Sequence, residues 1–117
     1  MLNPNKVSNT VELKVLVRFI QADGSAYDGD FVGVFKRPAD QEEVERVINE
    51  GWTNKDVVDE YLIGAKKIGA SPSEELSPED GLAFVKKQPE CVNASVTAFF
   101  QSFAPDRQRE KTSGRRR

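Results

Sequence analysis

The chain has 117 residues, of which 38% are hydrophobic and 31% charged, and its net charge is −2. This length suits one domain with a single modest core, and the small negative charge argues against nucleic acid as an obligate partner. Histidine is absent and Cys91 is the only cysteine, which excludes an intrachain disulfide and makes a reducing compartment the simpler assumption.

The N-terminal part of the chain predicts a flexible arm followed by a strand. Residues 1–10 are polar and carry no periodic pattern, which is typical of a loose arm. From Val11 to Ile20, apolar residues alternate with polar ones, so we predict a strand with one buried and one largely wet face. Leu16 and Ile20 interrupt the polar face, and we therefore expect part of that face to be covered.

A second strand is predicted at Phe31–Lys36, antiparallel to the first. The connection between the strands is long, and Gly24 and Gly29 within it permit positive φ angles. Two strands alone are marginally stable in water. The hairpin must therefore pack on helices, gain a third strand near residues 62–69, or pair with another chain.

Two short helices are predicted next. Asp40 is the expected N-cap of the first helix, with Glu43 as its capping-box partner, and Gly51 suits its C-terminal cap. Thr53 or Asn54 caps the second helix. The apolar stripes of the two helices consist of Val44, Val47 and Ile48, and of Val57, Val58, Tyr61 and Leu62.

Two further helices follow a loop at residues 71–77. Ser77 caps the third helix, and Pro89 begins the fourth, which Pro105 stops. The buried side of the third helix is predicted to contain Leu82, Val85 and Phe84. The stripe of the fourth helix consists of Val92, Val96, Phe99, Phe100 and Phe103.

These elements predict an α+β fold: an N-terminal β-hairpin or small antiparallel sheet followed by about four short helices. We expect a flexible arm at residues 1–10, one domain at residues 11–104, and a disordered basic tail at residues 105–117. The tail has six basic and two acidic residues, a net +4, which leaves −6 for residues 1–104.

No residue pattern predicts catalysis, a cofactor or a metal site. The acidic loop with Asp23, Asp28 and Asp30 lacks calcium-loop spacing and a terminal Glu, so we interpret it as a solvated turn. Cys91 has no histidine to act as its base, and we interpret it as a small packing residue. The sequence therefore favours a binding or assembly protein over an enzyme.

Aromatic side chains are the first candidates for binding a partner. Phe99, Phe100 and Phe103 could all complete the core. However, adjacent helical residues point about 100° apart, so one of Phe99 and Phe100 should lie at the margin of the buried face and could contact another protein. Trp52 is interpreted in the same way, as a lid on the core or as an anchor for a partner.

The basic tail is the second candidate. Arg107 and Arg109 lie within it and could form an electrostatic arm toward an acidic protein or nucleic acid, or the tail could only increase solubility. The opposite charges of the tail and the domain also allow head-to-tail self-association.

The order of these parts resembles the tail assembly chaperones of long-tailed bacteriophages, in the group that begins with a β-hairpin. The matching parts are Val11–Ile20, Phe35-Lys36-Arg37, the helix at Gln41–Asn49, Leu62-Ile63-Gly64, Leu76-Ser77-Pro78-Glu79-Asp80 and the helix from Val92 to Phe103. The similarity covers about residues 11–111 in order and spacing. The family commonly has a Trp after the Leu-Val-Gly element, where this chain has Ala65-Lys66-Lys67.

The resemblance implies an assembly role without catalysis. Such chaperones bind the phage tape measure protein in the cytoplasm of the infected bacterium, keep it soluble, and help the tail tube protein to polymerise around it. They are absent from the finished virion, and this chain would match their short form. Two other readings remain open: a structural virion component, such as a minor tail or head–tail connector subunit, and a small bacterial adaptor protein.

Overall fold

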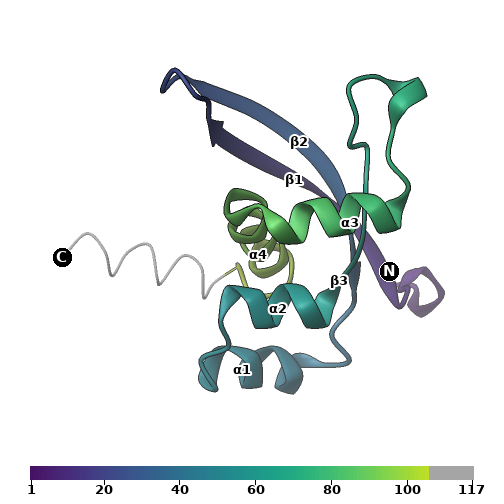
Figure 1. The fold of residues 1–117 in the computed structure, drawn as a ribbon. Coiled ribbons are helices and arrows are strands. Elements are labelled where there is room, and N and C mark those ends of the chain that lie inside the picture. The colour runs from purple at the N-terminus through teal and green to yellow at the C-terminus, as the bar shows by residue number, and fades with distance from the viewer. Residues whose placement is uncertain (106–117) are drawn as a thin grey trace.

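The computed structural model describes residues 1–105, which form a three-stranded antiparallel sheet and four α-helices (Figure 1). The α+β prediction is therefore confirmed. The strands are β1 (Thr10–Ile20), β2 (Ala26–Lys36) and β3 (Leu62–Lys66), and the helices are α1 (Gln41–Asn49), α2 (Asn54–Tyr61), α3 (Pro78–Lys87) and α4 (Pro89–Phe103). Two 3₁₀ turns, Pro4–Lys6 and Pro72–Glu74, complete the elements.

The β-hairpin is longer than the sequence predicts. β1 and β2 pair along their whole length, from Thr10↔Lys36 to Ile20↔Ala26, so β2 begins five residues before the predicted Phe31. The first half of β2 is polar and shows no strand pattern of its own. Pairing with β1 keeps this segment in the extended conformation of a strand, because cross-strand pairs stabilise a sheet.

The connection of the hairpin is correspondingly short. Gly24 has φ +87° in the turn, and its N–H donates to the Gln21 carbonyl at 2.9 Å. The expectation that Gly29 belongs to a long connection was wrong: Gly29 lies inside β2 opposite Val17, and it does not use the positive φ that glycine permits. A Cβ at Gly29 would lie 3.3 Å from the Tyr27 ring, so the glycine instead leaves room for that side chain.

The expected third strand is present. β3 pairs antiparallel with β2, with an irregularity between Val34 and Phe35, and the strand order is β1-β2-β3. Leu62 was predicted on the stripe of α2, but the helix ends at Tyr61 and Leu62 begins β3, where it is buried. Tertiary pairing with β2 thus ends the helix before its apolar pattern does.

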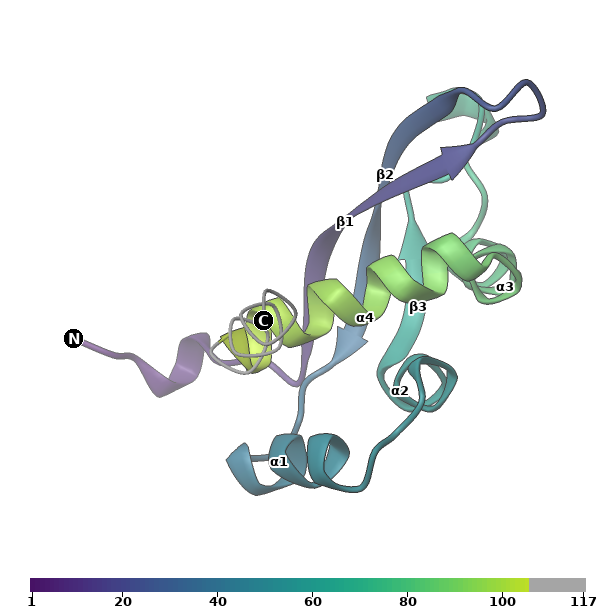
Figure 2. The ribbon, with the colours of Figure 1, turned by 90° about the vertical axis from the view of Figure 1, so that its left-hand side faces the viewer.

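Helices cover one face and one edge of the sheet. α4 crosses the sheet on the face that carries Val15, Val17, Phe31 and Phe35, and these side chains share one core with Val96 and Phe99 of α4 (Figure 2). α3 lies against β3 so closely that a Cβ at Gly81 would be 2.3 Å from the Ala65 carbonyl oxygen. The hairpin extends beyond the helices, and its turn lies far from α1 and α2 (Figures 1 and 2).

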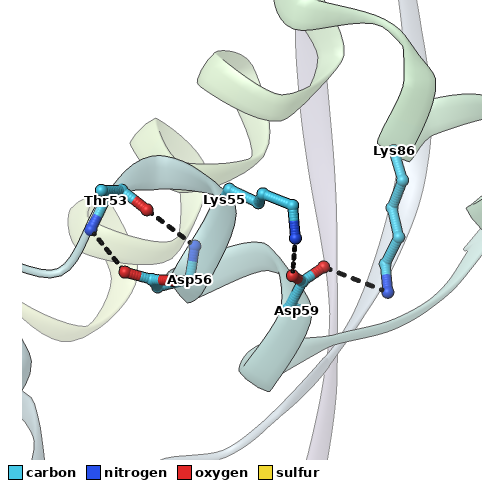
Figure 3. A network of polar contacts seen from close by, with 5 residues as sticks. All are labelled: Thr53, Lys55, Asp56, Asp59 and Lys86. Atoms are coloured by element: carbon cyan, nitrogen blue, oxygen red, sulfur yellow. Dashed lines mark hydrogen bonds and ion pairs between the residues drawn. The ribbon is translucent and has the colours of Figure 1, made fainter.

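Polar contacts fix the position of α2 (Figure 3). Thr53 and Asp56 form a reciprocal capping box with both hydrogen bonds at 3.1 Å, so Thr53 and not Asn54 is the N-cap. The Asp59 carboxylate accepts from Lys55 at 2.5 Å and lies 3.5 Å from Lys86 of α3. The hydrogen bond from Lys55 lowers the pKa of Asp59. Asp59 therefore joins α2 to α3.

Two helix predictions need correction. Asp40 caps α1 by accepting from the Glu43 N–H at 2.9 Å, but the Glu43 carboxylate accepts from the Tyr61 hydroxyl and does not complete a capping box. On α3, Val85 is fully buried and Leu82 partly buried, whereas Phe84 is 41% exposed. Gly81, which allows α3 to approach β3, occupies the buried face instead.

Candidate functional site

An aromatic cluster joins four of the predicted partner-binding residues. Phe99 is its centre: its ring centroid lies 4.6 Å from Tyr61, 5.4 Å from Phe100 and 5.2 Å from Phe103. Trp52 reaches the cluster through Tyr61, at 6.2 Å. These spacings fall in the range where aromatic pairs attract each other. Residues far apart in the sequence are thus held in one rigid group, called below the aromatic cluster.

The members of the aromatic cluster differ in exposure. Phe99 is fully buried, with 0% of its surface exposed. Phe100 and Phe103 are only partly buried, so the prediction that Phe99 and Phe100 cannot both point inward is confirmed. Trp52 is also partly buried, and its indole N–H donates to Glu50 at 3.2 Å. Phe99 is therefore a core residue, and Trp52, Phe100 and Phe103 offer the accessible aromatic surface.

Two basic residues at the end of β2 lie over this surface. The Arg37 guanidinium is 5.6 Å from the centroid of Phe103, and the Lys36 ammonium is 5.5 Å from that of Tyr61. Both distances allow cation–π attraction. Phe35 packs on the core side, 6.2 Å from Phe99. Phe35-Lys36-Arg37 is one of the sequence parts that resemble the chaperone family, and the structure places all three side chains at the aromatic cluster.

A buried hydroxyl fixes the base of the cluster. The Tyr61 side chain is 1% exposed, and its hydroxyl donates to Glu43 of α1 at 2.6 Å. Burial, followed by the hydrogen bond to Glu43, raises the pKa of Tyr61 above its usual range. The hydroxyl therefore stays protonated and ties α1 to α2 beneath Trp52.

The hairpin carries further exposed apolar residues, on both of its faces, that were not among the predicted partner-binding residues. Leu16 is 70% exposed, Ile20 66% and Tyr27 56%. The expectation that part of the polar face of β1 is covered was wrong at Leu16 and Ile20, because α4 packs on the other face of the sheet, which carries Val15 and Val17. Tyr27 lies on the opposite face, stacked on Phe19 at 6.4 Å. The sequence signal for this exposed surface was the presence of apolar residues, Leu16 and Ile20, at even positions of β1 that are otherwise polar.

Ion pairs surround Leu16 on this outer face of the hairpin. Arg18 donates two hydrogen bonds to Asp28, at 2.7 and 3.0 Å, and Lys14 lies 3.9 Å from Asp30. Farther along, Lys66 of β3 contacts Glu12 at 2.8 Å. The outer face is therefore a row of charges with an exposed leucine in its middle.

The other predicted positions fall into two groups. Arg107, Arg109 and all but the first residue of the predicted disordered tail lie outside the described residues. Cys91 is buried, and burial raises its pKa to about 11, which suits a packing residue. In the acidic loop, Asp23 accepts hydrogen bonds from Ser25, which lower the pKa of Asp23 and close the turn.

The described part of the chain contains neither a cluster of metal ligands nor a membrane-spanning helix. Among residues 1–105, no group of three or more Cys, Asp and Glu side chains could hold a metal ion. Within the same residues, no helix combines the length and apolar character that crossing a membrane requires.

Comparison with known proteins found no match to a family model, to a curated protein or to a solved structure. The candidate surfaces are therefore assigned from their own geometry.

Proposed function

We propose that this chain is a non-enzymatic phage tail assembly chaperone. In this role it binds the tape measure protein, keeps it soluble and promotes assembly of the tail tube protein around it. The order of sequence parts described above supports the family, and the aromatic cluster supports the mode of binding. The protein acts in the cytoplasm of the infected bacterium and leaves before the virion is complete.

The observation that carries the proposal is the partly exposed aromatic edge formed by Trp52, Phe100 and Phe103. Each side chain is anchored on one side by Tyr61 or Phe99 and reaches solvent on the other. An aromatic anchor that is already ordered loses little conformational entropy on binding. Aromatic residues are also enriched at the centres of protein interfaces. Such a surface suits apolar side chains of a long helical partner.

The rim of the surface adds a charge preference. Arg37 lies over Phe103, so a cation borders this end of the aromatic edge. Lys36, which lies over Tyr61, is paired with Glu60, and Glu50 accepts from Trp52. A partner helix with Asp or Glu beside the side chain that contacts Phe103 would therefore fit better than one with Lys or Arg there. Binding through apolar anchors also lets one chaperone recognise many turns of a long helix, and several bound copies gain avidity.

Co-expression with the tape measure protein encoded beside this chain tests the proposal. The tagged chain should recover soluble tape measure protein, which alone should be insoluble. A soluble, unbound chain beside an insoluble tape measure protein would contradict the proposal. Recovery of the chain from purified phage particles would instead favour the structural virion component.

Matched variants locate the binding surface. Phe100→Ala and Trp52→Ala should each reduce recovery of the tape measure protein at least tenfold while the chain keeps its far-UV circular dichroism spectrum. Phe84→Ala is the control, because Phe84 is an exposed aromatic on α3 outside the cluster. If the Phe100→Ala and Phe84→Ala variants recover equal amounts of tape measure protein, the aromatic edge is not the binding surface.

A further inference from the structure

The outer edge of β1 has hydrogen-bonding groups that the sheet leaves unused. β1 is the first strand in the order β1-β2-β3, so among residues 1–105 no strand pairs with its other side. The Arg37 N–H donates to the Asn9 carbonyl, and the Gln21 N–H to the Ser25 carbonyl, each at 2.8 Å. Both pairs follow the register of the β1–β2 ladder. Odd-numbered residues of β1 therefore bond to β2, and even-numbered residues direct N–H and C=O to the open edge.

One contact marks where the open edge begins. The Ser8 hydroxyl donates to the Thr10 carbonyl at 2.6 Å, which occupies the first outward-facing acceptor. The outward-facing groups from Glu12 to Ile20 are free of any such contact from the described residues. This stretch contains no proline and no bulge, two devices that commonly prevent strands from pairing at an edge.

We propose that the open edge of β1 binds β1 of a second copy of this chain. The two strands run antiparallel about a two-fold axis at Val15 and form a continuous six-stranded sheet. In this register Glu12 of each copy faces Arg18 of the other, and Lys14 faces Leu16. The inference rests on the edge and its charges, and is independent of the tape measure proposal.

Charge selects this register among those that the edge allows. Even-numbered residues must face even-numbered residues, so the axis lies on a residue of β1. With the axis at Leu16, Lys14 of each copy faces Arg18 of the other. With the axis at Lys14, the two copies of Lys14 face each other. Like charges directly opposite each other destabilise a sheet. An axis at Val17 brings no opposite charges together.

An axis at Leu13 is the remaining alternative. It faces Glu12 with Lys14, but beyond these positions it reaches Thr10, whose carbonyl is already used by Ser8. The Val15 axis uses the free edge from Glu12 to Arg18 in both copies. It therefore combines opposite charges with the longer ladder.

The pairing also covers apolar surface on both faces of the sheet. On the outer face, Leu16, 70% exposed, comes beside Leu16 of the second copy on the diagonal. On the inner face, Val11 faces Phe19, and Leu13 faces Val17. Val11, Leu13 and Phe19 are only partly covered by α4, so they have area left to bury.

The proposed charge row extends across both copies. Lys66 lies 2.8 Å from Glu12, and Arg18 lies 2.7 Å from Asp28, within one chain. When Glu12 faces Arg18 of the second copy, basic and acidic side chains alternate across the two chains in the order Lys66, Glu12, Arg18 and Asp28. High salt should therefore weaken the association.

The first experiment is sedimentation equilibrium of the full chain with two charge variants, Glu12→Arg and Arg18→Glu. The unaltered chain should form a dimer, and each variant alone should be a monomer, because like charges then face each other. An equimolar mixture of the two variants should dimerise again, since positions 12 and 18 of one copy then face residues of opposite charge in the other copy. A monomeric unaltered chain, or a mixture that stays monomeric, would overturn the proposal.

A cross-linking experiment tests the register without changing these charges. Lys14→Cys and Leu16→Cys chains should form a disulfide with each other under mild oxidation, because facing residues lie within disulfide reach. Neither variant alone should form one, and Cys91 is buried in all of them. A disulfide formed by Leu16→Cys alone, or by Lys14→Cys alone, would place the axis elsewhere and overturn the assigned register.

Discussion

The aromatic cluster and the hairpin use apolar residues in opposite ways. In the aromatic cluster, Phe99 is fully buried and each neighbouring ring packs on another, so apolar area stabilises the fold first. On the hairpin, Leu16 and Ile20 lie mostly in solvent and contribute little to the fold. Substitutions in the two regions should therefore separate stability from association.

The largest expected effect is from removing the centre of the aromatic cluster. Phe99→Ala should lower the free energy of unfolding by about 3–5 kcal/mol, because it leaves a cavity among four rings. Leu16→Ser on the hairpin should change it by less than about 0.5 kcal/mol. Urea unfolding followed by circular dichroism measures both, and equal losses would contradict the contrast between the regions.

The next-largest expected loss of stability comes from disturbing the close packing of α3 on the sheet. Gly81→Ala should cost roughly 1–3 kcal/mol, because its Cβ would lie 2.3 Å from the Ala65 carbonyl oxygen. Gly64→Ala is the matched control, since its Cβ would meet Val34 and Pro78 at 3.5 and 3.6 Å, which is ordinary contact. Thermal melts should show the lower Tm only for Gly81→Ala.

The hydroxyl of Tyr61 gives a smaller effect at the base of the aromatic cluster. Tyr61→Phe should cost about 1.5 kcal/mol, because Glu43 loses the hydrogen bond from a buried donor. Tyr27→Phe is the control on the hairpin, where the side chain is 56% exposed. An unchanged urea midpoint for Tyr61→Phe would show that water replaces the hydroxyl without cost.

The smallest effect concerns pH and the hairpin charges. The hydrogen bond from Arg18 lowers the pKa of Asp28 below 3.8, the ordinary value. A carboxyl group whose pKa is lowered in the folded state stabilises the fold at pH values above its ordinary pKa. That stability is lost as the pH falls through the folded-state pKa. Asp28→Asn should therefore lower Tm slightly at neutral pH, and the difference from the unaltered chain should vanish in acid. A difference that persists in acid would exclude this cause.

Local sequence signals predicted the helices well. Asp40, Thr53 and Ser77 each accept from a backbone N–H in the first turn, because a short polar side chain before a helix satisfies donors that nothing else reaches. Gly51 has φ +66° at the end of α1, as its position predicted. Helical periodicity also predicted Val96 and Phe99 on the buried side of α4, but it did not decide which of Phe99 and Phe100 points inward, and it missed the buried Ser95.

Local sequence signals did not predict the full length of the hairpin. The first half of β2 contains Asp28, Gly29 and Asp30, none of which favours a strand by itself. It becomes a strand because Arg18, Val17 and Leu16 lie opposite. The same limit affected Leu16 and Ile20, which were visible as exceptions on a polar face, but the sequence could not show that no helix among residues 1–105 covers that face.

By itself, the sequence determined the fold class, the caps and the apolar stripe of the last helix, because these depend on residues within a few positions of each other. Only the tertiary structure decided that Trp52, Phe100 and Phe103 pack around Tyr61 and Phe99 with Arg37 beside Phe103, and that no strand among residues 1–105 pairs with the outer edge of β1. Both results depend on contacts between segments distant in the sequence. Such contacts are set by how the sheet and helices pack, and no local pattern encodes them.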